Sequence, residues 1–81
     1  MSAEAVREEL IEIASLLVDD PGQVSVDEVP FRGGRLLTLH VAEDDLGIVI
    51  GRQGRTVRAL RALLTLRGER DGEQYELEIA E

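Results

Sequence analysis

The segment Gly51-Arg52-Gln53-Gly54 is the part of this chain whose residue types and spacing best suit a chemical task. Two glycines bracket two polar residues. Glycine lacks a Cβ, so it lets another backbone approach closely and adopts φ/ψ values that other residues avoid. The N–H groups of such a turn and of a following helix point outward together, which suits a phosphate. With Arg52 inside the turn and Arg55 directly after it, the segment predicts a phosphate clamp.

Charge is distributed unevenly around this turn. The formal net charge of the chain is −8, whereas a protein that binds nucleic acid is usually basic on the contacting face. Residues 51–67 nevertheless contain five arginines and no acidic residue, while residues 1–50 and 68–81 are both acidic. The chain has no lysine, and arginine suits bidentate contacts to phosphate. The positive segment therefore coincides with the predicted clamp.

Two helices are expected to hold the turn. Glu43-Asp44-Asp45 supplies N-cap candidates for a short helix, Leu46 to Ile50, that leads into the first glycine. A longer helix is predicted from Arg55 to Leu66, with a core face and a basic face. Arg67 is expected to interact with the dipole at the C-terminal end of this helix. The apolar face comprises Val57, Leu60, Leu63 and Leu64, and the basic face comprises Arg55, Arg58 and Arg61.

The remaining pattern predicts one more helix and three strands. The helix runs from Ala3 to Val18 with Val6, Leu10, Ile13, Ala14 and Leu17 on its apolar face. Strands are expected at 24–31, 37–41 and 75–79, and the first two form an antiparallel hairpin through the turn 32–35. A polar turn is expected at 68–72. A three-stranded sheet with one wet face must bury the other against helices, so residues 1–81 are predicted to form a single two-layer α+β domain.

Composition argues against several other classes of protein. With no cysteine and one histidine, disulfides, thiolate metal sites and histidine-rich metal sites are excluded. His40 is expected on a strand face and Tyr75 in the core with its hydroxyl at the edge. No nucleophile–base pair, Walker lysine or dinucleotide-binding glycine pattern is present, so we expect no enzyme, no cofactor and no metal. No apolar run approaches a membrane span or a signal h-region, which favours a soluble cytoplasmic protein without a membrane partner.

The segment 48–57, Ile-Val-Ile-Gly-Arg-Gln-Gly-Arg-Thr-Val, resembles the apolar-Gly-x-x-Gly-x-x-apolar motif of KH domains. With the order helix, strand, strand, helix, glycine turn, helix, strand, nearly the whole chain resembles a type II KH domain. It is similar in particular to the KhpA family of small stand-alone bacterial KH proteins.

This resemblance implies a function and a set of site residues. The N–H groups at Gly51 to Gly54 would hold the sugar-phosphate backbone of single-stranded RNA, about four nucleotides for one KH module. Bases would lie in an apolar groove, and the loop between the first two strands would form its second wall. For Arg61, Arg32 and Arg35, an RNA contact and a solvated surface position are both open. The implied RNA-binding residues are Gly51, Arg52, Gln53, Gly54, Arg55, Arg58, Ile48, Val57, Arg32 and Arg35.

The resemblance also implies partners besides RNA, since the family pairs with a larger KH-containing protein of the Jag type and self-associates. The leading hypothesis is a non-enzymatic RNA-binding protein that acts as an RNA chaperone or post-transcriptional regulator. The alternative is a protein-interaction adaptor that uses the KH fold mainly for homo- or heterodimerisation. The net charge of −8 favours the adaptor, and the arginines of residues 51–67 favour RNA.

Overall fold

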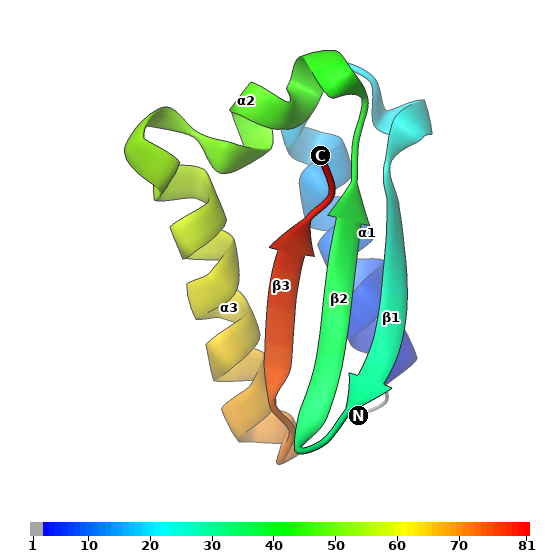
Figure 1. The fold of residues 1–81 in the computed structure, drawn as a ribbon, viewed down its shortest axis with the longest axis vertical. Helices are drawn as coiled ribbons and strands as arrows, with labels where there is room; N and C mark the ends of the chain where they lie inside the picture. Colours follow the sequence, from blue (N-terminus) through cyan, green and yellow to red (C-terminus); the bar gives the residue numbers. More distant parts are fainter. Residues whose placement is uncertain (1–2) are drawn as a thin grey trace.

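The computed structural model describes residues 3–81, so Met1 and Ser2 of the predicted domain lie outside the described residues. Three helices and three strands follow one another in the predicted order (Figure 1). Short 3₁₀ turns lie at 21–23, 43–45 and 52–54. The elements are α1 (Ala3–Leu17), β1 (Ser25–Phe31), β2 (Gly34–His40), α2 (Leu46–Ile50), α3 (Arg55–Asp71) and β3 (Tyr75–Ile79).

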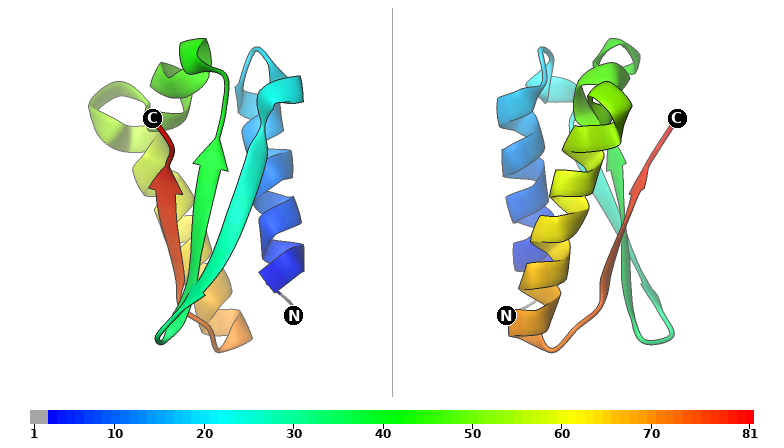
Figure 2. Two further views of the ribbon diagram at one scale, coloured as in Figure 1. Left: turned by 45° about the vertical axis from the view of Figure 1, so that its right-hand side comes forward. Right: turned by 90° about the vertical axis from the view of Figure 1, so that its left-hand side faces the viewer.

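The strands form one sheet in the order β1-β2-β3. β1 pairs with β2 in the predicted antiparallel hairpin, and β3 pairs with β2 in parallel. α1 and α3 lie side by side across one face of the sheet, as the turned views in Figure 2 show. No helix of residues 3–81 covers the other face, and this arrangement confirms the predicted two-layer α+β fold of a KH domain (Figure 2).

The core lies between the helical layer and the inner face of the sheet. Leu37 and Leu39 at its centre are fully buried, because alternate residues of a strand point to the same face. Val49 brings the short helix α2 into the same core. The other core residues are Val6, Leu10, Ala14, Val18, Val26, Val57, Leu60, Leu64, Tyr75 and Leu77.

Helix α3 is longer than the sequence pattern predicts. It continues to Asp71, and the expected polar turn at 68–72 is mostly its last turn, closed by Gly72 at φ 69°. Gly68 is buried within the helix, and glycine is needed there because a Cβ would lie 2.4 Å from the Glu73 carbonyl oxygen. Leu63, expected in the core, is half exposed.

Two further expectations about side chains are wrong. Arg67 is not a charge at the helix end, because it lies inside α3 and forms ion pairs with Glu9 of α1 and Asp71. Leu17, expected on the buried face of α1, is 41% exposed, and Val18 is buried in its place. The ion pair of Arg67 with Glu9 depends on how α1 and α3 meet, which helical periodicity alone does not specify.

Within residues 3–81, no helix is long and apolar enough to cross a membrane.

Candidate nucleic-acid interface

The turn between α2 and α3 has the backbone geometry that its glycines predict. Gly51 ends α2 with φ 78° and ψ 166°, and Gly54 precedes α3 with φ 73° and ψ 18°. Gln53 between them also has a positive φ of 57°, which costs a non-glycine residue about 1–2 kcal/mol. The turn is therefore held in a conformation that glycine at both ends permits.

The N–H groups of this turn are not equivalent. The N–H of Gly51 donates to the Gly47 carbonyl at 2.9 Å, and that of Gly54 donates to the Gly51 carbonyl at 3.0 Å. Within the described chain, the N–H groups of Arg52 and Gln53 have no backbone partner. Helical Arg52 followed by left-handed Gln53 forms the kind of concave pair of donors that binds anions.

Gly51 is also required by a close contact inside the protein. A Cβ at this position would lie 2.3 Å from Oγ1 and 2.7 Å from the backbone N of Thr56, in the first turn of α3. At Gly54 a Cβ would meet Val57 at an ordinary 3.8 Å. Gly51 therefore lets the turn fold back on α3. Gly54 is needed mainly because its backbone has a positive φ.

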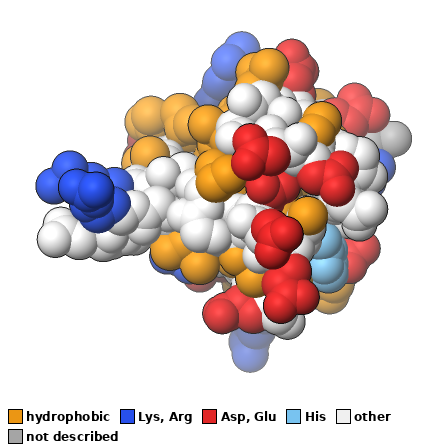
Figure 3. Space-filling view, turned by 90° about the horizontal axis from the view of Figure 1, so that it is seen from above, with side chains coloured by type: hydrophobic (Ala, Val, Ile, Leu, Met, Phe, Trp, Pro, Cys, Tyr) orange, Lys and Arg blue, Asp and Glu red, His pale blue; other side chains and the backbone are white. Residues whose placement is uncertain are grey.

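The arginines near the turn are exposed. Among residues 3–81, no ion pair involves Arg52, Arg55 or Arg58. Seen from the end that carries the turn, a group of basic side chains lies at the tip of a projection, while acidic side chains are scattered among apolar ones over the body (Figure 3). The projecting end thus offers free positive charge next to the unpaired N–H groups.

A groove of about 550 Å³ runs beside the turn, between the helices and strand β3. Its helical wall comprises Ile50, Val57 and Arg61. Val57, one of the implied RNA-binding residues, borders this groove. Ile48 does not border this groove, because the direction of α2 places Ile50 there. The strand wall comprises Leu36, Glu76, Leu77, Glu78, Ile79 and Glu81.

The acidic strand wall was missed by sequence reasoning. Glu76, Glu78 and Glu81 border the groove because β3 is an edge strand of the sheet. Arg61 extends across from α3, and its Nη2 donates to the Leu77 carbonyl at 3.4 Å. The alternation of residues 75–79 identifies Glu76 and Glu78 as exposed, but it does not place them beside the groove.

The hairpin turn of β1 and β2 does not face the groove, and the expectation that it forms a second wall is wrong. Arg35 pairs in register with Tyr75, which follows the C-terminal end of α3. The 17 residues of α3 span about 25 Å, so the hairpin lies at the opposite end of the molecule from the glycine turn (Figure 1). Arg32 and Arg35 are therefore not brought together with the other site residues.

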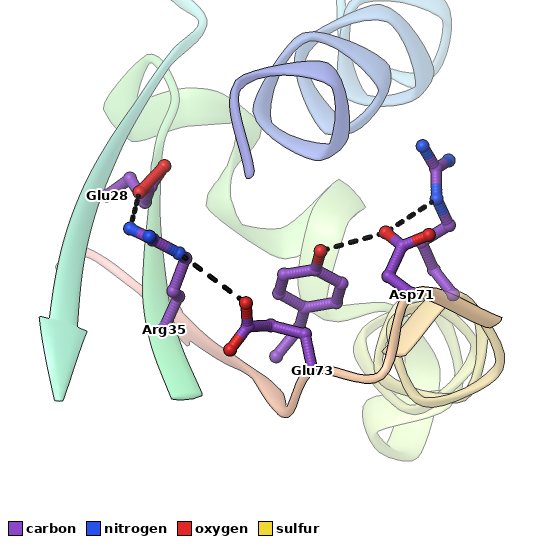
Figure 4. Close-up of polar contacts among 6 residues, drawn as sticks. Glu28, Arg35, Asp71 and Glu73 are labelled. Carbon is purple, nitrogen blue, oxygen red and sulfur yellow. Dashed lines mark hydrogen bonds and ion pairs between the residues drawn. The ribbon is translucent and has the colours of Figure 1, made fainter. Parts of the chain in front are cut away.

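Arg35 is also engaged in contacts of its own. Its guanidinium pairs with Glu28 of β1 at 2.6 Å and lies 3.9 Å from the carboxylate of Glu73 (Figure 4). The carboxylates of Glu28 and Glu73 therefore compensate the positive charge of Arg35 at the hairpin end of the fold.

A second polar cluster joins α1, α3 and β3 at the same end. The Tyr75 hydroxyl donates to Asp71 at 2.8 Å, and Arg67 donates to the same oxygen at 3.1 Å (Figure 4). Burial and the bond to Asp71 raise the pKa of Tyr75 to about 12. Burial alone would raise the pKa of Asp71, but the bonds from Tyr75 and Arg67 outweigh it and lower that pKa. As predicted, Tyr75 lies in the core, where its hydroxyl is bonded to Asp71.

Asp45 has a different role from the predicted helix cap. Its carboxylate is buried, makes no capping bond to α2, and accepts the N–H groups of Asp19 at 3.3 Å and Asp20 at 3.0 Å. It thereby fixes the α1–β1 loop against the start of α2. His40 lies on the strand face as expected, 2.8 Å from Asp27.

Comparison with known proteins gives a consistent result. The family described as KhpA/KhpB, KH domain, matches residues 7–79. "RNA-binding protein KhpA" of Treponema pallidum is 48% identical over 75 residues, which cover 91% of this chain and 94% of the relative. The protein of the same name from Chlamydia trachomatis is 40% identical over 76 residues, or 94% of this chain and 97% of the relative. That of Streptomyces coelicolor is 45% identical over 65 residues, 80% of this chain and 82% of the relative. No solved structure matches the chain.

Proposed function

Because this chain belongs to the KhpA/KhpB family of KH domains, we propose that it is an RNA-binding protein that grips short single-stranded RNA through Gly51 to Gly54. The relatives from Treponema pallidum and Chlamydia trachomatis are named RNA-binding proteins. The observation that carries the proposal is the pair of unpaired N–H groups at Arg52 and Gln53, surrounded by free arginines.

The grip divides between backbone and side chains. One phosphate accepts hydrogen bonds from the N–H groups of Arg52 and Gln53 in the concave turn. Arg52, Arg55 and Arg58 neutralise this and neighbouring phosphates. Because few phosphates are neutralised, affinity for a single short site is modest and falls as salt rises.

The bases lie in the neighbouring groove. Its helical wall provides the apolar surfaces of Ile50 and Val57, on which a base packs without an aromatic platform. About four nucleotides occupy one KH module. The protein is non-enzymatic in this proposal, and it works in the cytoplasm as an RNA chaperone or post-transcriptional regulator, with residues 1–81 as a single unit.

A protein-interaction adaptor is the second candidate, and a specific observation favours it. The helical layer exposes Leu16 of α1 by 82% and Leu63 and Leu66 of α3 by 50% and 63%. Exposed apolar side chains on neighbouring helices suit a protein partner, such as a Jag-type KH protein or a second copy of this chain. The two candidates use different faces, so both activities are compatible with one protein.

Fluorescence anisotropy with short single-stranded RNA tests the proposed grip. The double variant Arg52→Asp, Gln53→Asp places two negative charges in the clamp without touching the core. The variant Arg32→Asp, Gln74→Asp is its matched control, because it makes the same chemical changes at exposed positions at the hairpin end. Circular dichroism checks that both variants fold.

We expect wild type and the control to bind and the clamp variant not to bind. Equal binding by all three proteins would place RNA elsewhere and overturn the proposed site. If wild type itself does not bind RNA, the adaptor function replaces the RNA-binding one, and sedimentation then measures self-association.

A further inference from the structure

The outer face of the sheet, on the side away from α1 and α3, carries an exposed apolar cluster (Figure 2). Because successive residues of a strand point to opposite faces, Leu36 points outward beside the buried Leu37. Val29 pairs in register with Leu36, and Phe31 lies two residues beyond Val29 on β1. Val29 is 53% exposed, and Phe31, the single phenylalanine of the chain, is 40% exposed. Exposed apolar side chains that lie together mark a surface for interaction.

Carboxylates adjoin this apolar cluster. Glu76 of β3 pairs in register with Leu36, and Glu78 lies two residues further along the same face of β3. Both glutamates are exposed, and of the ion pairs in the described chain none involves either of them. His40 on this face lies 2.8 Å from Asp27. The outer face therefore has uncompensated negative charge next to its apolar side chains.

Four of these side chains line one groove of about 300 Å³, which we call the outer groove: Val29, Phe31, Leu36 and Glu76. Three of them are apolar, and the fourth ends in a carboxylate. Such a lining suits a side chain with an apolar stem and a cationic head. Arginine fits it best, because a flat guanidinium packs on an aromatic ring and also pairs with both oxygens of a carboxylate. Lysine instead offers a compact, strongly hydrated charge.

Charge also distinguishes between classes of macromolecule. The phosphates of RNA would be repelled by Glu76 and Glu78, whereas a basic segment of a protein is attracted to them. The free arginines of the glycine turn, to which phosphates are attracted, do not line the outer groove. The outer face is therefore complementary to a cationic polypeptide.

We propose that the outer groove binds an arginine side chain that a partner protein presents between apolar residues. The stem of this arginine lies along Val29 and Leu36. Its guanidinium packs on the ring of Phe31 and donates hydrogen bonds to the carboxylate of Glu76. Glu78 attracts further basic residues of the same segment. This surface is distinct from the glycine turn and from the exposed leucines of the helical layer.

Titration of the isotope-labelled protein with short peptides, followed through the NMR chemical shifts of its backbone N–H groups, tests this inference. The peptides carry arginine, lysine or citrulline, the uncharged analogue of arginine, between two leucines. No RNA is present, because Leu36 and Glu76 also border the groove beside the glycine turn. The arginine peptide is expected to shift the signals of Val29, Phe31 and Leu36. The citrulline peptide should bind about tenfold more weakly, since it lacks the ion pair and the attraction to the ring, and the lysine peptide should be intermediate.

Variants separate the two contacts of the guanidinium. Glu76→Gln keeps the side-chain shape but removes the charge, so the preference for arginine over citrulline should fall several-fold. Phe31→Leu keeps an apolar side chain but removes the ring, so the preference for arginine over lysine should fall. Glu12→Gln and Leu16→Ala are the matched controls, because they change an exposed carboxylate and an exposed leucine on α1, and both preferences should stay unchanged. The spectrum of each free variant shows that its fold is kept.

Several outcomes would overturn the proposal. These are equal binding of the three peptides by wild type, no binding of the arginine peptide, and shifts confined to residues outside the outer groove. Unchanged preferences in Glu76→Gln would contradict the role of its carboxylate in the same way. If sedimentation shows that wild type self-associates without peptide and that Phe31→Leu is monomeric, a second copy covers the outer groove and the proposal is wrong. The RNA grip is independent of all these results, because the peptides do not test the glycine turn.

Discussion

The carboxylate of Asp45 accepts a hydrogen bond from the N–H of Asp20 across 25 residues of sequence, at 3.0 Å. Asp45 is 2% exposed and also accepts the N–H of Asp19. It directly precedes α2, which leads into the glycine turn. The loop after α1 therefore fixes the start of α2, the short helix that leads into the projecting glycine turn.

Removal of this carboxylate should destabilise the protein. Asp45→Ala leaves two N–H groups without their acceptor, which costs about 1–3 kcal/mol of unfolding free energy. Asp45→Asn keeps one acceptor oxygen and should lose less. Urea unfolding followed by circular dichroism measures both, and equal stability of the alanine variant and wild type would contradict the role of Asp45.

The two glycines of the turn should respond differently to alanine. At Gly51 the added Cβ would lie 2.3 Å from Thr56 Oγ1 and 2.7 Å from its backbone N, in a conformation that alanine disfavours. At Gly54 the added Cβ would make only an ordinary contact of 3.8 Å with Val57, so the left-handed conformation alone is penalised, by about 1–2 kcal/mol. Thermal unfolding should show the larger loss for Gly51→Ala.

The variant Gly51→Ala, Thr56→Ala provides a control for this comparison. It removes Oγ1 but leaves the backbone N of Thr56, so only part of the lost stability should return. Full recovery would mean that the hydroxyl alone makes glycine necessary at position 51.

Tyr75 should titrate unusually late. Its pKa is raised to about 12 by burial and by the bond to Asp71, whereas an unfolded tyrosine titrates near 10. The neutral phenol is thus favoured by folding, and its stabilising contribution is present below pH 10 and lost as pH rises towards 12. The chain has one tyrosine and no tryptophan, so tyrosinate absorbance measures this group directly. Titration near pH 10 with the fold intact would contradict its buried bond.

Arg58 and Arg35 should differ in their effect on RNA binding. Arg58 is free and near the turn, so Arg58→Gln should weaken binding and reduce the salt slope by about 0.7, as one lost phosphate contact does for single strands. Arg35 is paired with Glu28 at the far end, so Arg35→Gln should leave affinity and slope unchanged. Anisotropy at several salt concentrations compares them, and equal losses would mean that RNA reaches the hairpin.

The order of the elements and the identity of the turn were predictable from sequence. Periodicity identified all three helices and all three strands, and β3 begins at Tyr75 and ends at Ile79 as predicted. The glycine spacing also identified the turn with positive φ values. These features depend on residues close together in the chain, whose local preferences are visible in its pattern.

Only the tertiary structure decided which of these elements meet. The parallel pairing of β3 with β2 places the glutamates of β3 beside the groove and the hairpin at the far end from the turn. The pairing of Arg67 with Glu9 joins residues 58 positions apart. Such contacts depend on topology and register. A sequence pattern indicates which face of a helix or strand is apolar. It does not tell which side chains face one another or how deeply each is buried, as the exposed Leu17 and Leu63 show.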